Sequence, residues 1–257
     1  MSVDPRAAID PSARLASDVS VGPFSVIGPG VEVGAGTWIG PHVVINGPTR
    51  IGRDNRIFQF ASVGEIPQDK KFHGEDTRLE IGDRNTIREY ATINRGTLQG
   101  GGVTRVGDDN WFMAYIHVAH DCQVGNGAIL ANGASLAGHV LIEDYAILGG
   151  FTLVHQFCRV GRHAFCGMGS AISKDVPPFM MVSGSPARTY GLNSEGLKRH
   201  GFSAEELRVL RQAYKVLYRS GLTLENAQAR LDQMAAASPA VSMLADFLRD
   251  SERSIMR

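Results

Sequence analysis

Residues 116–139, with the sequence IHVAHDCQVGNGAILANGASLAGH, gather the side chains best suited to chemistry. A histidine can remove a proton from a hydroxyl group near neutral pH, because its ordinary pKa is about 6.5. A backbone N–H group can stabilise the oxyanion that forms when this hydroxyl attacks a thioester, and glycine permits a close approach. His120, Asp121 and Gly138 therefore suggest a general base, its carboxylate partner and an oxyanion donor for acyl transfer.

A six-residue repeat predicts how these groups are positioned. Ile, Leu or Val recurs at every sixth residue through most of the chain between Ile9 and Ile172, often with glycine directly after it. A helix cannot use this period, because 3.6 residues per turn would spread the aliphatic side chains over its whole surface. Three short strands joined by corners can use it, as an 18-residue triangular coil whose sides stack into parallel sheets.

Stacked coils place residues 18 apart in one column, about 4.8 Å from each other. His120 then shares a column with Gly138 and Gln156. Beside this column lie Asp121, His139 and His155. Neighbouring residues on a strand point to opposite faces, so Asp121 reaches His120 only if the chain turns a corner between them.

Two polar segments, residues 64–80 and 94–105, interrupt the repeat and return to it nearly in phase. Loops on a rigid scaffold often carry binding groups, so we expect such groups here. The repeat ends after Ile172, and the composition changes near residue 190. We therefore expect a β-helical domain at residues 1–190 and a second domain at residues 191–257.

The second domain is expected to be helical. Ser203 and Glu206 have the spacing of a capping box, and the apolar residues that follow repeat with a helical period. Two further helices are expected after Thr223 and from Pro239.

Composition narrows the classes of partner and compartment. Lys plus Arg and Asp plus Glu number 26 each, so no net charge favours a nucleic acid or an anionic membrane. We expect neither a signal peptide nor a membrane-spanning segment, since no apolar run has the required length. Cys122, Cys158 and Cys166 form an odd set without metal-finger spacing, which predicts free thiols in the cytoplasm.

The histidines have two other interpretations. They can form an exposed polar stripe without chemistry, or they can bind zinc, as three histidines do in the trimeric γ-class carbonic anhydrases of similar fold. The zinc interpretation gives the loops and the helical tail no role, so we expect neither a metal nor a cofactor. Cys122 is a poor candidate nucleophile, because it falls at an inward-pointing small position of the repeat.

Several longer motifs resemble those of the acyl-[acyl-carrier-protein] (ACP):UDP-N-acetylglucosamine O-acyltransferase family. The motifs are residues 46–89, INRGTLQGGGVTRVGDDN, IHVAHDC, LAGHV, LVHQFCRVG and NSEGLKRHGFS. The resemblance covers nearly the whole chain. It implies a left-handed parallel β-helix followed by a small helical domain, assembled as a homotrimer with active sites between subunits. The implied reaction moves a 3-hydroxyacyl group from ACP to the 3-hydroxyl of UDP-N-acetylglucosamine, the first step of lipid A biosynthesis.

The resemblance also implies roles for individual residues. His120 would be the general base, Asp121 its support and the Gly138 N–H the oxyanion donor. The glucosamine and pyrophosphate region would be contacted by His117, His139, Asp69 and Lys71. The nucleotide would be held by His155, Gln156, Asn193, Glu195 and Arg199. Met168 matches the position that limits the acyl groove, which predicts a chain shorter than fourteen carbons, about ten, because methionine fills several methylenes of length.

Asn94 departs from the family pattern, in which many relatives have histidine beside the sugar. Asparagine keeps hydrogen bonding without a charge, so it is either a neutral replacement or a mark of a 3-amino sugar acceptor and an amide product. Two further alternatives are the related N-acyltransferase, which normally has an extra N-terminal domain, and a trimeric scaffold without activity. The hexads start at Ile9, and both polar loops are intact, which favours the O-acyltransferase.

Overall fold

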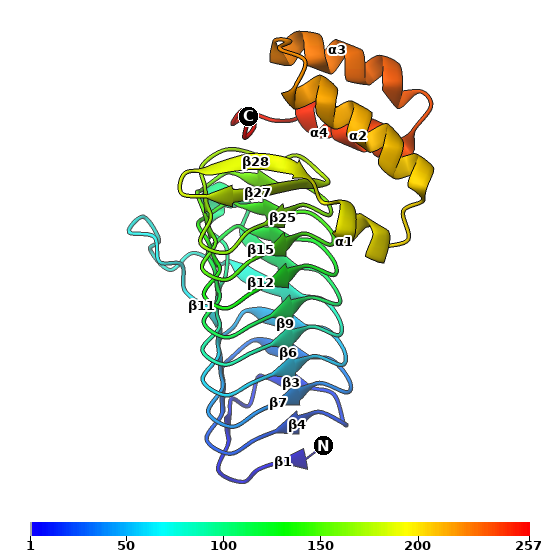
Figure 1. Ribbon diagram of the computed structural model, residues 1–257. Coiled ribbons are helices and arrows are strands. Elements are labelled where there is room, and N and C mark those ends of the chain that lie inside the picture. The colour runs from blue at the N-terminus through cyan, green and yellow to red at the C-terminus, as the bar shows by residue number, and fades with distance from the viewer. Residues whose placement is uncertain (1) are drawn as a thin grey trace.

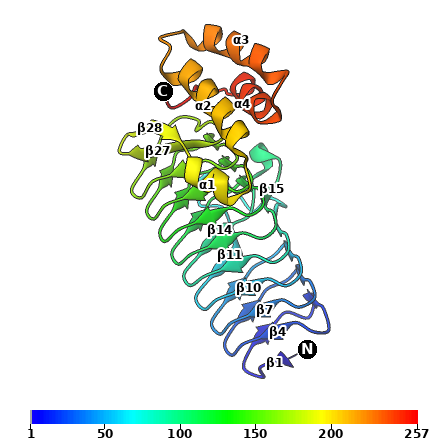
Figure 2. The same cartoon turned by 45° about the vertical axis from the view of Figure 1, so that its right-hand side comes forward.

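The structure is a computed structural model that describes residues 2–257. Its N-terminal part is the expected left-handed parallel β-helix, a triangular column with three sheets (Figures 1 and 2). The first sheet contains β1 (Ser2–Val3), β4 (Ser20–Val21), β7 (Trp38–Ile39), β10 (Arg56–Ile57), β13 (Thr86–Ile87), β16 (Trp111–Phe112), β19 (Ile129–Leu130), β22 (Ile147–Leu148), β25 (Phe165–Cys166), β27 (Met180–Gly184) and β28 (Ala187–Leu192). The second contains β2 (Ala8–Ile9), β5 (Val26–Ile27), β8 (Val44–Ile45), β11 (Ser62–Glu65), β14 (Thr92–Asn94), β17 (His117–Val118), β20 (Ser135–Leu136), β23 (Leu153–Val154) and β26 (Ala171–Ile172). The third contains β3 (Arg14–Leu15), β6 (Val31–Val33), β9 (Thr49–Ile51), β12 (Arg78–Ile81), β15 (Val103–Val106), β18 (Gln123–Val124), β21 (Leu141–Ile142) and β24 (Arg159–Val160).

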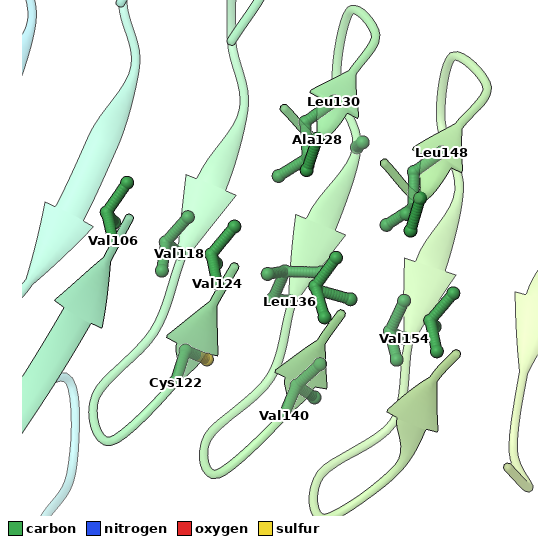
Figure 3. Close-up of a cluster of buried hydrophobic side chains, with 14 of the residues drawn as sticks. Val106, Val118, Cys122, Val124, Ala128, Leu130, Leu136, Val140, Leu148 and Val154 are labelled. Atoms are coloured by element: carbon green, nitrogen blue, oxygen red, sulfur yellow. The ribbon is translucent and has the colours of Figure 1, made fainter. Parts of the chain in front are cut away.

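The six-residue repeat produces this column because its aliphatic side chains all face inward. Val118 pairs with Leu136, and Leu136 with Val154, so in coils without an insertion each residue meets the one 18 positions further along the chain. These three side chains follow one another on successive strands in Figure 3, in the same core as Leu130 and Leu148. All five are at most 3% exposed, so each coil contributes to one continuous apolar core.

Three corners connect the sheets, and we number them in chain order. The first corner joins the first sheet to the second, the second joins the second to the third, and the third returns to the first. Each corner usually includes one residue with positive φ, such as Tyr115 at the first, Asp121 at the second and Tyr145 at the third. This conformation lets a strand end and the next begin within a few residues.

Both inserted loops leave the column at the second corner. The first loop spans residues 66–77, between β11 and β12, and projects from the column in Figure 1. The second spans residues 95–102, between β14 and β15, and contains the 3-10 helix η1 (Leu98–Gly100). The predicted bounds, 64–80 and 94–105, were too wide because their outer residues continue the strands. The insertions therefore lengthen one corner and leave the pairing of the coils intact.

The C-terminal part contains the predicted helices, α2 (Ala204–Tyr218), α3 (Leu224–Ala235) and α4 (Pro239–Arg249), preceded by the short α1 (Ser194–Arg199). The capping box is confirmed, since the Ser203 side chain accepts from the Glu206 N–H while the Glu206 carboxylate accepts from the Ser203 N–H. Strand β28 runs to Leu192, so helical structure starts slightly after the expected residue 191. None of the helices in residues 2–257 has the length and apolarity needed to cross a membrane.

Candidate active site

His120 and Asp121 form a hydrogen-bonded pair at the second corner. The Nδ1 atom of His120 lies 2.8 Å from Oδ2 of Asp121. The corner that this contact requires is present, because Asp121 has a φ of 61° and turns its side chain back toward its neighbour. An ionised carboxylate only accepts hydrogen bonds, so Nδ1 carries the hydrogen and Nε2 of a neutral His120 is left as the basic nitrogen.

The second inserted loop fixes Asp121. The Thr97 N–H donates to Oδ1 of Asp121 at 2.8 Å, and the Thr97 hydroxyl donates to Oδ2 at 2.7 Å. The Asp121 N–H in turn donates to the Thr104 hydroxyl at 2.7 Å. Gly100 permits this fit, because a Cβ atom there would lie only 2.0 Å from Cγ of Asp121. The carboxylate is therefore held by groups that lie outside the coil to which it belongs.

These contacts also keep Asp121 ionised. Burial acts to raise its pKa, but the hydrogen bonds from His120 and from both groups of Thr97 outweigh burial and lower the pKa below the ordinary value of 3.8. An anionic Asp121 beside His120 stabilises an imidazolium when His120 takes up a proton.

The His120 ring lies directly against the backbone of Gly138, as their separation of 18 residues predicted. A Cβ atom at Gly138 would lie 2.5 Å from Cε1 of His120, so no other residue fits there without moving the ring. Gly138 occupies the first turn residue of its corner, where proline stands at five corners of the first three coils. Those prolines are Pro5, Pro11, Pro23, Pro29 and Pro41.

A proline has no backbone N–H, so the column does not need a hydrogen bond from this position. Within residues 2–257 the Gly138 N–H has no acceptor. It is thus free to donate to a group beside His120, as an oxyanion donor must.

His139 and His117 complete the histidine cluster. The ring of His139 packs edge-on against His120, with 5.1 Å between centroids, and its Nε2 lies 3.7 Å from Oδ2 of Asp121. Nδ1 of His117 lies 2.8 Å from the Thr92 hydroxyl. Burial and the proximity of His120 lower the pKa of both histidines, while Asp121 opposes this shift at His139. Both rings therefore favour the neutral form near pH 7.

The zinc interpretation does not match this cluster. Among the described residues, the metal-ligating atoms that lie within 4.8 Å of one another belong to His120, Asp121 and His139. This set has two histidines and a carboxylate, whereas the interpretation required three histidines. Both carboxylate oxygens of Asp121 already accept hydrogen bonds from the protein. The arrangement is that of a hydrogen-bonded base and not of a vacant ligand set.

The first loop places Asp69 within electrostatic reach of the cluster, where its carboxylate offsets a part of the lowering of the His139 pKa by burial. Lys71 is exposed on the same loop, where its N–H donates to Oδ1 of Asp69 at 3.0 Å. Asn94 is only 3% exposed, and its Nδ2 donates to the Ile66 carbonyl at 2.9 Å. Asn94 thus holds the base of this loop.

The expected nucleotide-binding residues are divided between two corners of the chain. His155 and Gln156 are exposed at the second corner, one coil beyond His139. Asn193 caps α1 and donates from Nδ2 to the carbonyl of His163 at 2.9 Å, which places α1 at the third corner. Glu195 and Arg199 are exposed on the same helix.

Met168 lies at the first corner, almost three coils beyond His120, and is 78% exposed. The structure therefore brings together His117, His120, Asp121, Gly138 and His139 near the first loop. It does not bring α1 or Met168 to them within one chain.

Comparisons with known proteins agree with this geometry. A family model described as UDP N-acetylglucosamine O-acyltransferase, domain 2, matches residues 175–256, and one described as bacterial transferase hexapeptide (six repeats) matches residues 104–138. The acyl-[acyl-carrier-protein]–UDP-N-acetylglucosamine O-acyltransferase of Thiobacillus denitrificans is 59% identical over 100% of this chain and 99% of its own length. That of Halorhodospira halophila is 59% identical over 99% of both chains. The chain belongs to this O-acyltransferase family.

Solved structures of the O-acyltransferase family have the same fold along their whole length. LpxA from Acinetobacter baumannii superimposes with a TM-score of 0.97 at 47% identity, with 99% of each chain covered. UDP-N-acetylglucosamine O-acyltransferase from Moraxella catarrhalis gives a TM-score of 0.98 at 44% identity, with 100% of each chain covered. The match includes the C-terminal helices as well as the β-helix.

Sequence reasoning missed the residues that hold Asp121. Thr97 and Gly100 lie in the segment RGTLQGGG, where a threonine followed by glycines suggests a capped turn, and Thr97 does cap η1. Nothing in that pattern indicates a contact with Asp121, 24 residues away. Cys122 lies next to Asp121 but is inward-facing, and burial raises its pKa to about 12, so it is not a nucleophile.

We expect Thr97→Ala to lower the free energy of unfolding by about 1–2 kcal/mol at pH 7, because a hydrogen bond to a buried carboxylate is lost. The folded-state pKa of Asp121 lies below its ordinary value of 3.8, so its ionised network stabilises the fold above that pH and less as the pH falls. The difference between the variant and wild type should therefore shrink below pH 3.8. Urea unfolding at a series of pH values measures this. Thr92→Ala, which removes only the partner of His117, is the control. A loss of stability in Thr97→Ala that is equal at every pH would contradict the hydrogen bonding of Thr97 to an ionised Asp121.

Proposed function

We propose that this chain transfers a 3-hydroxyacyl group from ACP to the 3-hydroxyl of UDP-N-acetylglucosamine, the first step of lipid A biosynthesis. The observation that carries the proposal is the stack of His120, anchored by Asp121, on the backbone of Gly138. Full-length relatives that are named for this reaction support the acceptor and donor.

The geometry suggests a direct transfer. Nε2 of His120 removes the proton from the sugar hydroxyl as its oxygen bonds to the thioester carbon. The Gly138 N–H donates to the oxyanion that develops on the carbonyl oxygen, and Asp121 stabilises the protonated imidazole. The intermediate collapses as the C–S bond breaks, and the proton on His120 passes to the departing thiolate of the carrier. Atoms and charges balance without an added cofactor.

We infer that the complete site forms between subunits of a homotrimer. The base is at the second corner, α1 with Asn193 and Arg199 is at the third, and Met168 is at the first, so one chain cannot surround one substrate. Two different corners of neighbouring chains can meet around a threefold axis.

The first corner also carries a ladder of stacked rings whose exposed apolar surface is typical of a contact between chains. The ladder comprises Phe24, His42, Phe60, Tyr90 and Tyr115. Cys122, Cys158 and Cys166 are all buried and unpaired, which suits the reducing cytoplasm, where we place the reaction.

The direct test incubates the full chain with UDP-N-acetylglucosamine and 3-hydroxydecanoyl-ACP and measures the mass of the nucleotide sugar. Wild type should add one hydroxyacyl group, and His120→Ala should lower kcat by about 10²–10⁴-fold, because the general base is lost. His73→Ala, on the exposed outer part of the first loop, is the matched control and should keep its activity.

Two outcomes count against this assignment. With a UDP-sugar that carries a 3-amino group offered in competition, a product that survives mild alkali is an amide, and its excess over the ester would indicate the 3-amino acceptor considered for Asn94. No product with any acyl donor would indicate a scaffold without activity.

Met168 is proposed to end the acyl groove. Its side chain is apolar and 78% exposed, at a height of almost three coils, about 13 Å, above His120 along the column. Such a side chain needs an apolar neighbour, and an acyl chain that extends from His120 along the contact between subunits would supply one.

Met168→Gly should shift the preference toward longer acyl chains, because removal of the side chain opens room for several methylenes. We expect the ratio of kcat/KM for fourteen-carbon to ten-carbon donors to rise at least about tenfold. Competition between the two acyl-ACP donors measures this ratio, with Met181→Ala as the control. An unchanged ratio, or wild type that prefers fourteen carbons, would contradict the role of Met168.

A further inference from the structure

The last eight residues form a strap across the end of the β-helix, anchored on both sides of Arg253. Before it, the Ser251 hydroxyl donates to Oδ2 of Asp175 at 2.7 Å. After it, the Asp175 N–H donates to the Ser254 carbonyl at 3.0 Å, and the Met256 N–H donates to the Asp175 carbonyl at 2.8 Å. Asp175 is itself only 1% exposed. The position of Arg253 is therefore set by a fixed backbone.

Between these anchors, Arg253 reaches the second corner. Its Nη2 donates to the Gln156 carbonyl at 3.0 Å, and its guanidinium lies over the Phe157 ring, 5.6 Å from the centroid. Within residues 2–257 it has no carboxylate within ion-pair distance. The charge of Arg253 acts to lower the pKa of the buried Asp175, but its guanidinium hydrogen-bonds the Gln156 carbonyl and not that carboxylate.

The contact of Arg253 extends the column that contains the candidate base. Phe157 has a φ of 65° and stacks on His139, with 4.5 Å between centroids and 9° between planes. His139 packs edge-on against His120. One series of ring contacts thus leads from the C-terminal strap to the base, and Gln156 is the sequence neighbour of Phe157, at the coil where the nucleotide is expected.

We propose that Arg253 is a positioning residue for the nucleotide sugar, which rests on the proposed function. Its hydrogen bond to the Gln156 carbonyl and its contact with Phe157 hold the corner at residues 155–157. The backbone of this corner is hydrogen-bonded to the coils on both sides, through the His155 N–H to the Ile172 carbonyl and the Phe157 N–H to the Gly138 carbonyl, but the side chains of its three residues are exposed. A fixed corner directs the side chains of His155 and Gln156 to the nucleotide and reduces the entropy lost on binding.

The simpler explanation is that the strap only closes the open end of the column. Ile255 and Met256, which are 1% and 4% exposed, and the Ser251 contact with Asp175 are sufficient for that purpose. Closure does not require Arg253 to reach Gln156. The two roles therefore belong to different residues of the same strap and can be separated.

The test compares Arg253→Ala, Arg253→Lys and Ser251→Ala in the full chain. Calorimetry gives the Kd for UDP-N-acetylglucosamine without donor, steady-state assays give KM and kcat, and thermal unfolding gives Tm. Arg253→Ala should raise Kd and KM for the nucleotide sugar about tenfold, with kcat within about twofold and Tm near wild type. Lysine can donate to the Gln156 carbonyl and should restore most of the affinity. Ser251→Ala should lower Tm and leave Kd near wild type.

Equal Kd values for wild type and Arg253→Ala would overturn the proposal, as would parallel losses of affinity and Tm in Arg253→Ala and Ser251→Ala. Wild type that binds UDP-N-acetylglucosamine but forms no product would count against the proposed reaction only, and Kd would still test Arg253. Wild type that does not bind the nucleotide sugar would overturn both.

Discussion

The backbone hydrogen bonds between successive coils are the constraint on which the rest of this structure depends. Coils without an insertion pair with the next at a spacing of 18 residues, as between Val118 and Leu136, so every side chain there has a fixed neighbour above and below. The site uses this register directly. His120 lies against Gly138 because they are 18 residues apart, and His139 and Phe157 stack for the same reason.

A rigid register leaves few places where the chain can vary, and both insertions use the second corner. The strands on either side of each loop stay paired, so the loops add contacts without disturbing the column. Thr97, from the second loop, holds Asp121 in the left-handed conformation that turns its carboxylate toward His120. Such a conformation costs about 1–2 kcal/mol for a non-glycine residue, and the hydrogen bonds of Thr97 and Thr104 offset this cost.

Much of this arrangement was predictable from sequence because the repeat is local and periodic. The six-residue period places His120 over Gly138 and predicts the inward-facing Cys122, and the capping box at Ser203 with the helical period after it predicts the helices beyond residue 200. The hydrogen bonds from Thr97 to Asp121 were not predictable, because the length of an insertion does not show how its residues fold back onto the coil. The division of the expected binding residues among three corners also needed the structure, since the period gives columns but does not place α1. Arg253 lies outside the repeat altogether, and its contact with Gln156 spans 97 residues.

The central claim is that the bare backbone of Gly138 beneath His120 forms the reaction site. The kcat of Gly138→Ala tests it most directly, because the added Cβ would lie 2.5 Å from Cε1 of His120 while the φ at this position is not positive and suits alanine. Gly191→Ala is the control, since its Cβ would meet no atom within 4 Å. We predict a folded Gly138→Ala variant with kcat lowered by at least about 100-fold, the cost typical of a disturbed oxyanion site. Wild-type kcat in that variant would contradict the account.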